Sequence, residues 1–126
     1  MADDQAARGV PVVVALPAEI DVTNCDQVHD QLVAAFEPGA GIVIADLTST
    51  VFCDSSGVHA IMRAYERAAA RDIQLWLAVP QTGSVRRVLQ LTGVGRLMPV
   101  YPSLQEAMSA ALPASVDHRK RGSGRT

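Results

Sequence analysis

The sequence predicts an α/β fold built on a mostly parallel sheet. Short apolar runs alternate along the chain with stretches that have helical periodicity. Apolar residues make up 48% of the 126 residues but aromatic residues only 4%, so the core must consist of Val, Leu, Ile and Ala. The run Ile42–Asp46 is almost continuously apolar, as is typical of a strand covered on both faces. Because strands and helices alternate, we expect right-handed crossovers between parallel strands.

Four apolar runs of strand length predict the sheet. They are Val10–Leu16, Ile42–Asp46, Ile73–Val79 and Leu97–Tyr101. Pro99 interrupts the last run, and because proline has no N–H to donate, that strand is expected at an edge or broken. Residues 17–21 are expected to form a connection.

Four stretches with apolar residues at helical spacing predict the helices. They are the segment between Asn24 and Pro38, Val58–Ala69, Ser84–Leu91 and Leu104–Ala111. Thr23 or Asn24 can cap the first helix, and Ser103 with Glu106 can form a capping box on the last.

Length and charge limit the organisation and the partners. The chain is long enough for one domain, expected at 10–112, with a flexible tail at 1–9 and a disordered basic tail at 113–126. A net charge of −2 and a pI near 5.8 argue against a nucleic-acid partner. No apolar run reaches the ~20 residues that span a bilayer, and the N-terminus lacks the basic start of a signal peptide. We expect a cytoplasmic protein that does not bind membranes.

The segment after Ile42–Asp46 carries the clearest chemical signal. Asp54, Ser55 and Ser56 lie where a loop becomes a helix N-terminus. The first-turn N–H groups there have no partner within the helix, so the position tolerates a phosphate. A plain helix cap formed by Asp54 or Ser55 accounts for the same residues. Spacing alone leaves both interpretations open.

Enzymatic functions are disfavoured by the same segment. The Gly-x-Ser-x-Gly esterase motif fails, because Cys53 or Asp54 stands where the first glycine belongs. His59 could approach Ser55, but a lone surface histidine is the simpler interpretation. Cys25 and Cys53 have no metal-ligand spacing. We expect no catalytic residue, no metal and no cofactor.

A phospho-aspartate receiver is a second alternative. Asp46 ends a strand, and Glu19 and Asp21 could hold a magnesium ion. However, no Lys-Pro pair follows a late strand, and the single lysine is Lys120.

Three segments in order resemble one protein family. The central segment reads Val43-Ile-Ala-Asp-Leu47, then Phe52-Cys-Asp-Ser-Ser-Gly57. Upstream lies Ala18-Glu-Ile-Asp21, and downstream lies Ser84-Val-Arg-Arg-Val-Leu-Gln-Leu-Thr-Gly93. Together these resemble the STAS family of sulfate transporters and anti-sigma factor antagonists, over about residues 10–112. The resemblance implies a STAS-like fold, which is a mostly parallel four- to five-stranded sheet with helices packed as successive βα turns.

The resemblance also implies site residues. The serine after the aspartate is the phosphate acceptor in that family, which corresponds to Ser55, with Ser56 as the second candidate. Asp21 and Asp54 match the acidic residues around it. His59 stands where the family commonly has glycine, so it places an imidazole near the site. The expected partner-binding residues are Asp21, Asp54, Ser56, Gly57, Val58, His59 and Met62.

The implied function is that of an anti-sigma factor antagonist in transcription regulation, as in a stress response. Such a protein binds an anti-sigma factor serine kinase when unphosphorylated, which releases a sigma factor. Phosphorylation of Ser55 by that kinase inactivates it, and a PP2C-type phosphatase resets it. The protein is expected to be a monomer or weak dimer. The alternative is a non-phosphorylated STAS scaffold or adaptor in a larger sensory or transport assembly.

Overall fold

Residues 10–112 are described by the structure, which is a computed structural model of the chain. The predicted tails at 1–9 and 113–126 lie outside the described residues. The assignment of 10–112 as one domain remains a prediction.

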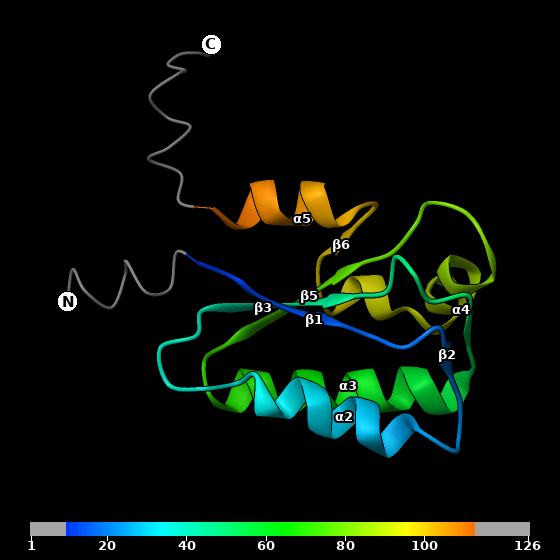
Figure 1. Cartoon of the computed structure of the whole chain (residues 1–126), viewed down its shortest axis with the longest axis horizontal. Coiled ribbons are helices and arrows are strands. Elements are labelled where there is room, and N and C mark those ends of the chain that lie inside the picture. Colours follow the sequence, from blue (N-terminus) through cyan, green and yellow to red (C-terminus); the bar gives the residue numbers. More distant parts are fainter. Residues whose placement is uncertain (1–9, 113–126) are drawn as a thin grey trace, which may run out of the picture.

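Four parallel strands form the main sheet, in the order β1-β3-β5-β6 (Figure 1). Their bounds are β1 Val12–Ala15, β3 Ile42–Asp46, β5 Gln74–Ala78 and β6 Val100–Tyr101. The predicted mostly parallel sheet is therefore confirmed. β6 is an edge strand and starts after Pro99, whose carbonyl accepts a hydrogen bond of 2.9 Å from the Leu77 N–H.

Helices lie on both faces of this sheet (Figure 1). They are α2 Cys25–Ala34, α3 Ser55–Ala70, α4 Ser84–Thr92 and α5 Leu104–Ala111. Because side chains alternate along a strand, Val43 and Ala45 enter the large core with α2 and α3. Ile44 points to the other face and joins a smaller cluster with Trp76 and Ala78, beneath α5. The Trp76 ring also lies 5.2 Å from that of Tyr101, centroid to centroid.

A second, two-stranded sheet corrects the expectation for residues 17–21. β2 (Glu19–Ile20) pairs in parallel with β4 (Phe52–Cys53), so part of the expected connection is a strand. Two residues are too few for any hydrophobic period, and only the pairing across the chain defines them. This pair brings the loop after β2 beside the start of α3.

The cap of α2 differs from the sequence expectation. Asn24 is the N-cap residue but makes no side-chain capping bond. Its amide instead bridges the preceding loop, accepting from the Asp21 N–H (2.9 Å) and donating to the Glu19 carbonyl (2.8 Å). At α5, the Ser103 hydroxyl accepts from the Glu106 N–H at 3.1 Å, as expected for one bond of a capping box.

Packing under α5 can be tested with one pair of variants. Ile44 is fully buried, whereas Val13, its register partner on β1, is 38% exposed. Ile44→Ala should lower the free energy of unfolding by about 2–5 kcal/mol, because it leaves a cavity. Val13→Ala should cost less than about 1 kcal/mol. Urea unfolding measures both, and equal losses would contradict this packing.

Candidate functional site

Asp54 caps α3. Its backbone is extended, and Oδ1 accepts hydrogen bonds from the N–H groups of Ser56 (2.9 Å) and Gly57 (3.2 Å). Such a cap stabilises a helix by about 1 kcal/mol. The sequence left the capping residue open between Asp54 and Ser55, and the structure assigns it to Asp54. The Ser55 hydroxyl is therefore not needed for the cap.

Ser55 and Ser56 occupy the first turn of α3 but differ in exposure. Ser55 is exposed, and within residues 10–112 its hydroxyl makes no hydrogen bond to another residue. Ser56 is half-buried, as is Asp54. The more accessible of the two candidate hydroxyls is thus the one on Ser55.

Asp21 belongs to a tightly bonded loop. Its Oδ1 accepts from the N–H (2.9 Å) and the hydroxyl (2.5 Å) of Thr23. The bond from the Thr23 hydroxyl, and then the bond from its N–H, lower the pKa of the Asp21 carboxyl below its usual value. The carboxylate is therefore ionised at neutral pH.

The β2–β4 pair places the Asp21 loop and the Asp54 cap at the same end of two adjacent strands. Ile20 is the register partner of Cys53, and the Asp54 N–H donates to the Ile20 carbonyl at 3.2 Å. The Thr50 hydroxyl adds a bond of 2.9 Å to the Pro17 carbonyl, and Thr50 is 5% exposed. Two carboxylates predicted from separate motifs are thus brought to one edge of the fold.

Gly57 permits close contact between α3 and these strands. A Cβ atom built on it would lie 2.6 Å from Cys53 Sγ and 2.7 Å from Ile20 Cγ2. Both distances are far below van der Waals contact, so only glycine fits.

Two of the predicted partner-binding residues, Gly57 and Val58, lie on the inner face of α3. Gly57 is buried, and Val58 is 3% exposed. They face inward because the apolar stripe of α3 packs on the sheet. Their role is to support the first turn from below.

A groove runs between α2 and α3, with a volume of about 460 Å³. Its lining residues are Cys25, Ser56, His59, Met62, Arg63 and Glu66. Three of the predicted partner-binding residues, Ser56, His59 and Met62, therefore share one surface. The sequence did not predict the groove, since its α2 side is defined only by packing of the two helices.

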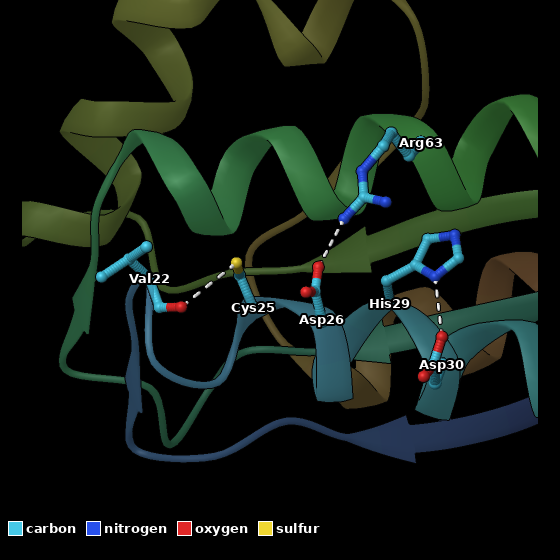
Figure 2. Close-up of polar contacts among 6 residues, drawn as sticks. All are labelled: Val22, Cys25, Asp26, His29, Asp30 and Arg63. Carbon is cyan, nitrogen blue, oxygen red and sulfur yellow. Dashed lines mark hydrogen bonds and ion pairs between the residues drawn. The ribbon is translucent and has the colours of Figure 1, made fainter.

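The guanidinium of Arg63 crosses from α3 to α2. Its Nη2 lies 3.2 Å from Asp26 Oδ1, as Figure 2 shows. Both side chains are largely exposed, so the pair contributes at most about 1 kcal/mol. Arg63 is nevertheless held toward α2 rather than toward the start of α3.

The segment from residue 10 to residue 62, which carries the predicted site residues, is acidic in sequence. Between residues 10 and 62 there is no Lys or Arg, whereas the carboxylates are Glu19, Asp21, Asp26, Asp30, Glu37, Asp46 and Asp54. Exposed apolar side chains also lie on the two paired loops, at Val22 (72% exposed), Val51 (66%) and Phe52 (46%). Exposed apolar side chains that lie close together are typical of protein-contact surfaces.

Residues 10–112 contain neither a candidate metal centre nor a candidate membrane-spanning helix. No group of three or more His, Cys, Asp or Glu side chains there could hold a metal ion. None of the helices in this range is both long and apolar enough to cross a membrane.

The chain was compared with known proteins. A family model described as the STAS domain matches residues 2–107. The comparison with curated proteins finds no match. Among solved structures, an anti-sigma-factor antagonist (STAS) domain protein from Planctomyces limnophilus is 27% identical, with a TM-score of 0.66 and coverage of 83% of this chain and 91% of that one.

Two further structures share the fold at lower identity. The anti-sigma factor antagonist SpoIIAA in its unphosphorylated form is 24% identical, with a TM-score of 0.64 and coverage of 87% of this chain and 90% of that one. A sulfate transporter family protein from Wolinella succinogenes is 15% identical, with a TM-score of 0.69 and coverage of 80% and 84%. These two likenesses establish the fold alone.

Substitution of Gly57 tests the contact beneath the site. Gly57→Ala should lower the free energy of unfolding by about 1–3 kcal/mol, because the new methyl group overlaps Cys53 and Ile20. Gly95→Ala is the matched control, since its Cβ would lie 3.9 Å from the nearest atom, a Val100 methyl. Denaturant unfolding measures both. A stabilised Gly57→Ala, as helix propensity alone predicts, would contradict the close approach.

The cysteines should differ in reactivity. Burial, and secondly the charge of Asp54, raise the pKa of the Cys53 thiol to about 11. Only about a thousandth of it is thiolate at pH 8. Half-buried Cys25, at the groove, should therefore react with iodoacetamide well before Cys53. Mass spectrometry of the labelled peptides decides, and faster labelling of Cys53 would show that its burial is wrong.

Proposed function

The chain belongs to the STAS domain family, and from this we propose that it is an anti-sigma factor antagonist controlled by phosphorylation. In its unmodified form it binds an anti-sigma factor serine kinase, which frees a sigma factor. Phosphorylation of Ser55 by that kinase ends the binding, and a PP2C-type phosphatase restores it. The anti-sigma-factor antagonist (STAS) domain protein from Planctomyces limnophilus, which is 27% identical to this chain, supports the proposal.

One observation carries the proposal: the Ser55 hydroxyl is exposed and is not used by the helix cap. Asp54 performs the capping, so Ser55 can be modified without loss of the bonds to Ser56 and Gly57. SpoIIAA, whose structure is that of an unphosphorylated form, supports a phosphorylated state in this fold.

The transfer itself needs ATP and Mg²⁺ from the kinase. The Ser55 oxygen attacks the γ-phosphorus, a new O–P bond forms, and the bond from that phosphorus to ADP breaks. The hydroxyl proton passes to a kinase base or to water. In the separate step catalysed by the phosphatase, water attacks the phosphorus, the bond from the phosphorus to the Ser55 oxygen breaks, that oxygen takes up a proton originating from the water, and inorganic phosphate leaves.

The phosphate would act through charge at a docking surface. It adds a charge of about −1.5 to −2 beside Asp54 and at the edge that holds Asp21. Repulsion between unit charges at ~5 Å costs about 1–3 kcal/mol at effective dielectric constants of ~20–80. The docking surface we propose comprises the Asp21 loop, Ser55, and the groove that contains Ser56, His59 and Met62. A partner presenting an acidic or closely fitted surface there would be expelled.

The competing function is an adaptor that is never phosphorylated. The likeness to the Wolinella protein favours it only at the level of fold. The two functions differ in whether a kinase modifies Ser55.

Phosphate transfer provides the first test. The full chain is mixed with candidate anti-sigma factor serine kinases and Mg·ATP, and intact mass and peptide mapping are recorded. One phosphate should appear on Ser55. Ser56→Ala should retain the modification and Ser55→Ala should lose it. If kinases bind the chain but none of them phosphorylates it, the adaptor function is favoured.

Charge mimicry provides the second test. Ser55→Asp should change the free energy of unfolding by less than about 1 kcal/mol, since the cap remains. It should weaken binding to the kinase by about a hundredfold, equivalent to roughly 3 kcal/mol. Ser55→Ala should bind as the wild type does. Calorimetry and urea unfolding separate the two effects, and an unfolded Ser55→Asp would exclude a surface switch.

A further inference from the structure

The N–H groups that usually receive a phosphate at a helix start are already occupied in this chain. The Asp54 carboxylate accepts hydrogen bonds from the N–H groups of Ser56 and Gly57, which both belong to the first turn of α3. A phosphate on Ser55 would be attached next to that carboxylate, at a helix start where two N–H groups are already bonded. Its charge must therefore be offset by a side chain or by solvent.

Few side chains near Ser55 in the sequence can provide this offset. The neighbouring helix α4, which contacts β4 and α3, carries Arg86 and Arg87, and Arg86 donates to the Pro80 and Val79 carbonyls. No Lys or Arg occurs from residue 10 to residue 62, and the first basic residue on α3 is Arg63. Arg63 lies two helical turns from Ser55, and Asp26 on α2 holds its guanidinium (Figure 2). Within one turn of Ser55 on α3, the remaining group that can carry a positive charge is His59.

His59 is placed correctly for this role. At about 100° per residue, it lies about 40° around the helix from Ser55 and about 60° from Ser56, one turn further along. His59 is exposed and lines the groove with Ser56. An anion at position i and a cation at i+4 is also the more favourable order on a helix.

We propose that His59 is the proton-binding partner of the phosphate on Ser55, so that the effective charge of the phosphorylated site depends on pH near neutrality. This inference rests on the proposed phosphorylation of Ser55 and specifies how that site is regulated. The other groups around His59 are Arg63 and Glu66 on α3, Cys25 and Asp26 on α2, and Asp54 at the cap.

The sign of the effect follows from charge. A phosphate near His59 favours the imidazolium, so phosphorylation should raise the pKa of His59 relative to the unphosphorylated chain. The coupling is reciprocal, so the imidazolium lowers the second pKa of the phosphate. Below the raised pKa of His59, part of the phosphate charge is cancelled, and above it the full charge acts. Phosphorylation should therefore weaken binding of the chain to the kinase more strongly at pH 8 than at pH 6.

The test does not need a kinase, because phosphoserine can be incorporated at position 55 during translation. Histidine resonances of the full chain are titrated by NMR with serine or phosphoserine at 55. The pKa of His59 should rise on the order of half to one pH unit. His29, which faces Asp30 on α2, is the internal reference and should not move.

A ³¹P titration supplies the second measurement. His59→Gln should raise the second pKa of the phosphate, whereas Arg63→Gln should leave it nearly unchanged. Equal pKa values of His59 in both proteins, or a larger effect of Arg63→Gln, would overturn the proposal. If kinases fail to modify Ser55, that result contradicts the proposed function, whereas the coupling between His59 and a phosphate at position 55 is decided by the two titrations alone.

Discussion

The short parallel pairing of β2 with β4 is the constraint on which the site depends. Each strand has only two residues, yet the register fixes Ile20 beside Cys53 and joins Asp54 to Ile20 through a backbone bond. Around this pair, the Asn24 amide holds the ends of the Asp21 loop together. Gly57 then allows the first turn of α3 to rest on both strands without a gap. The placement of the Asp21 loop beside the Asp54 cap and the first turn of α3 follows from this contact.

The chemistry of the edge follows from a division of roles among neighbouring residues. Asp54 caps the N-terminus of α3, and hydrogen bonds from Thr23 lower the pKa of the Asp21 carboxyl. The Ser55 hydroxyl makes no hydrogen bond to another of the described residues. The region already carries negative charge with little local compensation. An added phosphate therefore changes an interface more than a fold, because no bond of the core has to break. That is the physical basis for preferring a charge switch over a conformational one.

The sequence was informative where a pattern was long enough to have a period. β3 has the bounds that its apolar run predicts, and α4 begins at Ser84 as expected. The two-residue strands could not be predicted, because their partner is distant in the chain and their side chains show no repeat. The capping residue of α3 was ambiguous, because Asp54 and Ser55 can both accept hydrogen bonds and only the backbone angles decide between them. Thr23 or Asn24 was expected to cap α2, and Asn24 does occupy the N-cap position, but sequence spacing does not reveal the competing bonds of its side chain to Asp21 and Glu19. The groove needed the packing of two helices, which no local signal encodes.

The position of Trp76 has a practical consequence. The only tryptophan lies on the face of the sheet opposite α3, against Tyr101 and beneath α5. Its fluorescence emission depends on the packing of that small cluster and should not respond to a partner bound at the edge that holds Asp21 and Asp54. A complex could form there without any spectral change, so an unaltered fluorescence spectrum is no sign that two proteins have failed to meet. A fluorescent dye attached to the Cys25 thiol, which lines the groove, would change its emission when a partner binds there.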